Sequence, residues 1–142
     1  MHITQESDYA VRILYCLART GRRMGAKEVS EKMSVPLRFA LKITGKLVSE
    51  GLVCSFKGNR GGYELARPAA EITLLDAISA VEGPYQLSRC LCDSTSPEGC
   101  ACSRGAWGIC TFQHEFDRIS QIVNRELAAV SFADLLAKEG RT

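Results

Sequence analysis

A glycine-rich turn between two short β-strand patterns is the feature that most limits the folds that this chain can adopt. The turn reads "KGNRGG", residues 57–62, and it separates "LVCSF" at 52–56 from "YELA" at 63–66. Glycine adopts positive φ angles readily, so this pattern predicts a tight β-hairpin. Lys57 and Arg60 give its turn a positive charge.

Three helical patterns precede the hairpin. The first runs from a cap at Thr4 to Gly21, the second covers residues 26–33, and the third runs from a cap at Ser34 to Gly51. In each pattern, apolar residues recur at intervals of three and four, which is the helical period. A tight turn joins the second and third patterns, as in a helix-turn-helix unit. Three helices followed by a basic hairpin predict a mainly α winged helix-turn-helix fold.

Helical patterns also dominate the second half of the chain. A capping box at 73–76 begins a helix that should end at Gly83. Apolar residues then recur at helical spacing across 112–130, about five turns. A helix of this length outside a compact head needs a partner surface, so we interpret its apolar stripe as the contact of a homodimer; the alternative is that it folds back on its own head. A short last helix should begin at Ser131, and a loose tail at Lys138.

The third helix carries a line of cations. Arg38, Lys42 and Lys46 recur every four residues and therefore share one face. Duplex DNA presents dense phosphate charge, and a helix in the major groove contacts bases near its N-terminal end. We therefore expect Arg38 and Lys42 to contact bases, and Thr44 and Lys46 to contact the DNA backbone. Three more candidate DNA contacts lie in the hairpin turn: Lys57, Asn59 and Arg60.

Charge and composition limit the other functions. The 142-residue chain has a net charge of only +2, so any DNA-binding surface must come from local placement of cations. The N-terminus is acidic where a signal peptide is basic, and no apolar run approaches about 18 residues. We expect a cytoplasmic protein without a membrane segment. With two histidines, no phosphate-binding loop and no nucleophile near a base, an enzyme is not expected.

Five of the seven cysteines lie within residues 89–110, a stretch that has no helical or strand period. Cytosolic thiols stay reduced, so such a cluster indicates metal binding or redox chemistry. The loop at 83–110 exceeds the 12 to 15 residues, roughly, beyond which structureless loops are uncommon, and a bound iron-sulfur cluster or zinc ion would order it. Oxidation of the CxC pairs to a disulfide is a third possibility. Cys16 and Cys54 are predicted to be packing residues.

Longer segments resemble the IscR/NsrR family of winged-helix transcriptional regulators, which contains iron-sulfur sensors and cluster-free members. These segments are "SDYAVRILYCLA" in the first helix, "SEGLVCSFKGNRGGYELARP" through the hairpin, and "ITLLDAISAVEGP" before the cysteines. The resemblance covers nearly the whole chain. It implies a homodimer on a near-palindromic site in double-stranded DNA, with the long helices crossing at the two-fold axis.

The resemblance also implies a ligand set, because three cysteines hold the cluster in cluster-binding members. Cys90 and Cys110 correspond to the first and last ligands. Cys100 is favoured as the middle ligand and Cys102 is its alternative. Cys90, Cys100 and Cys110 are evenly spaced, and Cys92 and Cys102 repeat the same interval. In both series the cysteines are farther apart than in the family.

A fourth ligand is expected from another part of the chain. Asp8 matches the position at which nitric-oxide-sensing members contribute a carboxylate from the partner subunit. The alternative interpretation is that Asp8 pairs with Arg12 one turn later. His114 is the competing ligand, although the family histidine corresponds to Gln113 in this chain.

These features predict three parts: a DNA-binding domain at 1–82, a cysteine-rich cluster loop at 83–110, and a dimerisation helix and tail at 111–142. The expected function is transcriptional regulation in which an iron-sulfur cluster, 2Fe-2S or 4Fe-4S, controls operator affinity and senses redox state, nitric oxide or iron supply. The alternative is a cluster-free regulator that uses zinc, a disulfide switch or a partner protein.

Overall fold

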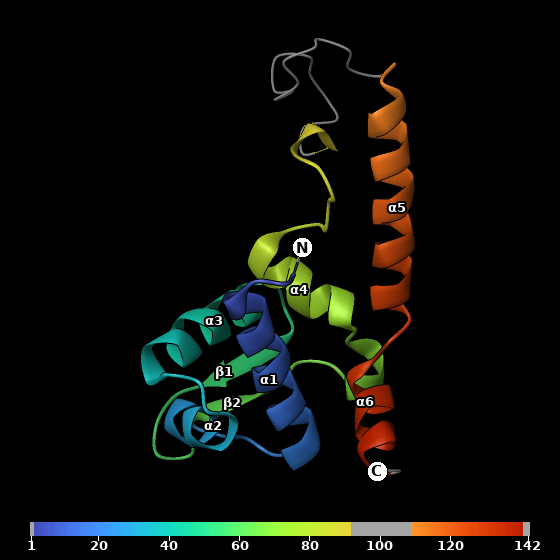
Figure 1. Ribbon diagram of the computed structural model, residues 1–142. Coiled ribbons are helices and arrows are strands. Elements are labelled where there is room, and N and C mark those ends of the chain that lie inside the picture. The colour runs from blue at the N-terminus through green and yellow to red at the C-terminus, as the bar shows by residue number, and fades with distance from the viewer. Residues whose placement is uncertain (1, 92–108, 141–142) are drawn as a thin grey trace. The chain divides into compact units, whose positions relative to one another are not determined.

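The computed structural model describes residues 2–91 and 109–140, and in these ranges it forms six α-helices and one two-stranded sheet (Figure 1). The described residues fall into two compact units. We call residues 2–83 with 127–140 the head, and the described residues between 84 and 126 the arm. No helix in the described ranges is long and apolar enough to cross a membrane.

Helix α1 (Gln5–Thr20) is the central helix of the head. It packs against four others: α2 (Ala26–Met33), α3 (Leu37–Ser49), α4 (Leu74–Glu82) and α6 (Phe132–Glu139). The Thr4 side chain caps its first turn by accepting a hydrogen bond from the Ser7 backbone N–H, and Gly21 ends it in the left-handed conformation. Fully buried side chains from α1, α3 and the turn between α2 and α3 contribute to the core: Ile13, Leu14, Leu17, Val35, Ile43 and Leu47.

The expected helix cap at Ser34 is wrong. Ser34 follows α2 with φ of 54°, and its backbone N–H donates to the Ser30 carbonyl, so it closes the second helix and does not begin the third. Pro36 is the residue before α3. The proline side chain has no polar atom, so α3 begins without a side-chain cap.

The wing consists of β1 (Val53–Phe56) and β2 (Gly62–Leu65), which are antiparallel, with Val53 opposite Leu65. Met24 adds an isolated bridge to β2: the Met24 N–H donates to the Tyr63 carbonyl at 2.9 Å, and the Tyr63 N–H donates back at 2.7 Å. These two bonds attach the wing to the segment between α1 and α2. Together, the three helices and the wing confirm the predicted winged helix-turn-helix fold.

The head is completed by α4 (Leu74–Glu82), by a 3-10 turn at Ala69–Glu71, and by α6 (Phe132–Glu139) from the far end of the chain. The capping box predicted at 73–76 is present, and Ser131 forms a second one. The Phe132 N–H donates to the Ile72 carbonyl at 2.9 Å, and the Phe132 side chain is fully buried. Helix α6 continues past Lys138, where we expected a loose tail, and Glu139 accepts hydrogen bonds from Tyr15 and pairs with Arg19 at 3.3 Å.

The arm contains α5 (Thr111–Ala128), whose last two residues belong to the head, and the segment 84–91, which includes a 3-10 turn at Arg89–Leu91. Side chains on one edge of α5 bind this segment. Asn124 donates to the Tyr85 carbonyl at 3.1 Å, and the Ser120 hydroxyl accepts from the Leu87 N–H at 2.9 Å. The segment therefore runs along α5 in the opposite direction. The predicted long helix is confirmed, and it ends two residues earlier than the apolar pattern.

Candidate DNA-binding face and cysteine site

The cations of α3 lie on the side of the helix that faces away from the core. Arg38 and Lys42 are exposed and Lys46 is half-buried, whereas Ala40 and Ile43 are fully buried on the opposite face. The Arg38 guanidinium stacks on the Phe39 ring at 4.8 Å from its centroid. The amphipathic pattern therefore places positive charge where a duplex can reach it, as the sequence predicts.

Two of these cations share one carboxylate of α1. Lys42 Nζ lies 2.5 Å from Glu6 Oε1, and Lys46 Nζ lies 3.0 Å from Oε2. The hydrogen bond from Lys42, followed by that from Lys46, lowers the pKa of Glu6. Ion pairs at a surface contribute little to stability, so phosphate oxygens can replace Glu6 as partners of these lysines.

The expected contact of Thr44 with the DNA backbone is wrong. Thr44 is only 3% exposed, and its hydroxyl donates to the Ala40 carbonyl at 2.5 Å. Positions four apart share a helix face, so Thr44 lies with Ala40 on the buried side. The residue type of Thr44 and its cationic neighbours do not show which face of the helix it lies on. Its position in the helical period does.

The wing presents its three candidate DNA contacts to solvent: Lys57, Asn59 and Arg60 are all exposed. Arg23, which the sequence analysis missed, supports them from outside the hairpin. Its guanidinium lies 3.4 Å from the Phe56 ring centroid and donates to the Arg60 carbonyl at 3.0 Å. The sequence around Arg23 does not predict a role at the wing, because its contacts depend on the bridge between Met24 and Tyr63.

The arm brings two of the candidate cluster ligands to one end of α5. Cys90 and Cys110 are half-buried free thiols. Cys110 immediately precedes α5, and the Gln113 side chain in the first turn of that helix donates to the Cys90 carbonyl at 3.3 Å. Ser88 Oγ lies 3.1 Å from Cys90 Sγ. The other three candidates, Cys92, Cys100 and Cys102, lie outside the described residues.

This donor set suits an iron-sulfur cluster. Cys90 and Cys110 are free thiols near the first turn of α5, and cysteine sulfur is the ligand that iron-sulfur clusters take. In the described part of the chain, no three histidine, cysteine or acidic side chains come together as a metal site.

The candidates for the fourth ligand lie in different units. Asp8 is in the head, where it pairs with Arg12 at 2.8 Å, as in the alternative interpretation of this residue. His114 is in the first turn of α5, and its backbone N–H donates to the Cys110 carbonyl at 3.1 Å. Gln113, one residue earlier, contacts Cys90 through its side chain.

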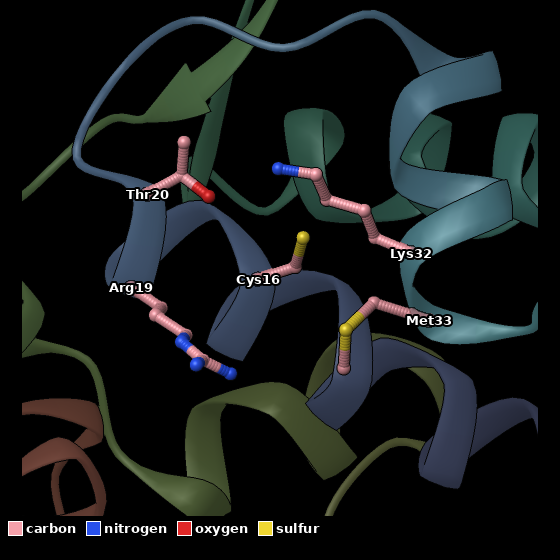
Figure 2. Close-up of a pocket in the computed structure, with 5 residues that line it drawn as sticks. All are labelled: Cys16, Arg19, Thr20, Lys32 and Met33. Atoms are coloured by element: carbon pink, nitrogen blue, oxygen red, sulfur yellow. The ribbon is translucent and has the colours of Figure 1, made fainter.

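The two cysteines of the head differ in burial. Cys16 is 4% exposed and lies at a pocket of about 490 Å³ that Arg19, Thr20, Lys32 and Met33 also line (Figure 2). Burial raises the pKa of its thiol, which keeps it protonated and unreactive. Its sulfur lies 3.9 Å from Met24 Sδ, so Cys16 packs in the core as predicted. Cys54 in β1 is half-buried.

The fold and its basic outer face define a winged helix-turn-helix protein of the kind that binds DNA. The sequence profile of Rrf2, described as iron-dependent transcriptional regulators, matches residues 3–138. The chain belongs to the Rrf2 family. This is a family of transcriptional regulators and not of enzymes, in agreement with the expectation from the sequence.

Individual relatives agree with this family. Protein aau3 of Rhizobium meliloti is 36% identical over 91 residues, covering 63% of this chain and 59% of the relative. The regulator NsrR of Oceanobacillus iheyensis is 27% identical over 141 residues, covering 98% and 92%. The chain spans only 53 to 59% of the length of the first curated relatives that it matches.

Two solved structures share the fold. The T. potens IscR structure has a TM-score of 0.73 at 20% identity and covers 98% of this chain and 88% of that one. CymR, the global cysteine regulator of B. subtilis, has a TM-score of 0.72 at 25% identity, with coverage of 97% and 98%.

Proposed function

We propose that this protein regulates transcription by placing α3 in a major groove of duplex DNA and its wing against the adjacent groove or phosphates. The observation that carries this proposal is the outward line of cations on α3, with a basic wing in the same unit. Helix-turn-helix proteins use this geometry, in which base contacts come from the N-terminal part of the second helix. Arg38 and Lys42 are in that part of α3.

The test compares two double variants with the same loss of charge. R38A/K42A removes cations from the proposed DNA face, and R125A/K138A removes two from elsewhere. Binding to duplexes selected from a random-sequence library is measured by fluorescence anisotropy over a range of salt. We expect R38A/K42A to lose sequence-specific binding, because both residues are assigned to base contacts, and R125A/K138A to keep it. Equal binding by both variants contradicts the proposal.

We also infer a homodimer that pairs through α5. Four large apolar side chains on α5 are 37 to 62% exposed: Phe112, Phe116, Ile119 and Ile122. This stripe is on a different edge of the helix from Ser120 and Asn124, which bind the segment 84–91. Two copies that pair the same stripe are related by a two-fold axis, and this symmetry fits a near-palindromic operator.

The third part of the proposal is that an iron-sulfur cluster controls the affinity for DNA. Cys90 and Cys110 would hold it together with Cys100 or Cys102, and Asp8 of a partner subunit is our candidate for the fourth ligand. When bound, the cluster supplies reactivity toward oxygen, nitric oxide or iron loss. Ser88 is placed to hydrogen-bond the Cys90 sulfur, a contact that tunes such centres.

Protein isolated without air tests this part. We expect stoichiometric iron and sulfide in the parent chain and in the control C54A, and loss of both in C90A and C110A. The affinity for the selected duplex should change when the iron is removed. Iron content that is unaffected in C90A and C110A, or an affinity that is the same with and without iron, contradicts the cluster proposal and leaves the DNA-binding proposal intact.

A cluster-free regulator is the second candidate, and its support is the 25% identity to CymR over nearly the whole chain. The thiols would then respond through disulfide formation, zinc binding or a partner protein. A colourless, iron-free protein that still binds the selected duplex, with an affinity that responds to an oxidant or a zinc chelator, favours this candidate.

A further inference from the structure

Two leucines on the outer face of α3 lie outside the buried core of the head. Leu37 is 45% exposed and Leu41 is 48% exposed. They are four residues apart and therefore adjacent on the helix surface. Isolated exposed leucines are common in proteins, but this pair lies on the helix that is proposed to enter DNA. The packing of the head does not explain it, because the core face of α3 is formed by Ala40, Ile43 and Leu47.

The leucines form a line beside the line of cations. The rotation of 100° per residue places Leu37 and Leu41 on one side of the exposed face, and Arg38, Lys42 and Lys46 on the other. The next position in the leucine line is Gly45, where an added Cβ would meet no atom within 4 Å. Glycine destabilises a helix interior, and here the packing does not require it. Its absence of a side chain leaves this part of the face open to close approach.

An apolar line beside a cationic line matches the surface of a major groove. Phosphates border the groove, and on its floor the only apolar group of the base edges is the thymine C5-methyl. A protein partner would also accept the leucines, but the adjoining cations favour a polyanion. Because cations lie next to the leucines, we take duplex DNA as the partner that binds this face.

We propose that Leu37 and Leu41 determine operator specificity by contacting thymine methyl groups in the major groove. This inference rests on the proposed DNA-binding function. The cations then hold the helix on the duplex through base and phosphate contacts, and the leucines distinguish A·T pairs at the positions beneath them. Burying one methyl group corresponds to a preference of about fourfold, or about 0.8 kcal/mol.

The experiment uses uracil, which is thymine without its methyl group. Duplexes are first selected by the parent protein from a random-sequence library. Each thymine of the best duplex is then replaced by deoxyuridine, one at a time, and the affinity is measured by anisotropy at fixed salt. The same duplexes are titrated with L37A, with L41A, and with I3A as the control, because Ile3 is equally exposed at 48% and lies outside α3.

We expect deoxyuridine to cost the parent and I3A about fourfold at one or two positions in each half-site. L37A or L41A should bind the thymine and deoxyuridine duplexes with the same affinity at those positions, as a double-mutant cycle requires when a contact is removed. The uracil series with the parent protein does not depend on the folding of any variant.

Two outcomes overturn this inference. In the first, the parent binds one duplex tightly but loses no affinity at any deoxyuridine position. In the second, L37A and L41A keep the full thymine preference and instead change the oligomeric state, which would assign the leucines to a second copy of the chain. Failure to select any duplex would be a different result, because it contradicts the DNA-binding proposal itself.

Discussion

Glu6 shows how a single carboxylate can limit the affinity of a DNA-binding surface. The Glu6 carboxylate accepts hydrogen bonds from Lys42 and Lys46, two cations that the proposed function assigns to DNA. A duplex must therefore displace Glu6, or bind beside its negative charge. Residues 6 and 42 are far apart in the sequence, and no local pattern connects them. The structure alone identifies this competition.

Replacing Glu6 with glutamine should release both lysines. We predict that E6Q binds non-specific duplex DNA a few-fold more tightly than the parent at low salt, and that the difference decreases as salt screens the phosphates. The control is E31Q, which removes one exposed carboxylate from α2. Anisotropy titrations of both variants check this, and an equal gain in affinity would mean that only net charge matters.

Glu82 links the end of α4 to the start of α1. Its carboxylate accepts hydrogen bonds from the hydroxyls of Thr4 and Ser7 and, at 3.0 Å, from the Thr4 N–H. Burial acts to raise the pKa of Glu82, but the hydrogen bonds from Ser7 and Thr4 outweigh it and lower the pKa. The folded state therefore favours the ionised carboxylate.

The lowered pKa of Glu82 makes the stability of the fold depend on pH. A carboxylate with a lowered pKa contributes stability above its unfolded pKa, about 4.3, and this contribution is lost as the pH falls through the lower folded value. We predict that E82Q is less stable than the parent at pH 7 by about 0.5 to 1 kcal/mol, since the group is partly exposed. Urea unfolding should show this difference decreasing below about pH 4; a difference that is independent of pH would exclude the carboxylate charge as its cause.

At the scale of the elements, the attachment of the wing to the head requires glycine at position 62. Gly62 has φ of 136°, and a Cβ there would lie 2.6 Å from the Met24 carbonyl oxygen. We predict that G62A costs about 2 kcal/mol or more and weakens DNA binding, because the bridge from Met24 must open. The control is G58A, with φ of 87° and no atom within 4 Å of its Cβ. It has backbone strain without the clash, so urea unfolding should show a smaller loss; equal losses would rule out the clash.

The elements themselves were largely predictable, and their long-range contacts were not. Helices α1, α2, α4 and α5 follow from apolar periodicity and caps, and the wing follows from its glycines. Ser34 was misassigned because it adopts a left-handed conformation that favours glycine, a choice made by the turn as a whole. Arg23 and Glu6 were missed because their partners are distant in the sequence. In the candidate site, Cys90 and Cys110 were proposed from the resemblance to the family, whereas the contact of Gln113 with Cys90 needed the structure.

At the scale of the whole molecule, the two ends of the described chain form one core. Phe132 is fully buried in the head, and the backbone around it bonds to residues 72–74. We predict that F132A lowers the free energy of unfolding by about 3 to 5 kcal/mol, the usual cost of removing a buried aromatic ring. The control L41A, at a position that is 48% exposed, should change it little. Thermal or urea unfolding checks both, and similar stabilities would show that α6 is not needed by the head.

The attachment of α6 to the head has a consequence for how the protein is made. The ribosome releases α1 to α4 first and the arm next, and the helix that completes the core of the head emerges after both. A chain interrupted by a premature stop after α5 would carry every proposed DNA contact and lack Phe132. We expect such a product to be degraded and not to act as a partial repressor or activator, since the nascent head cannot close its core before α6 has been made.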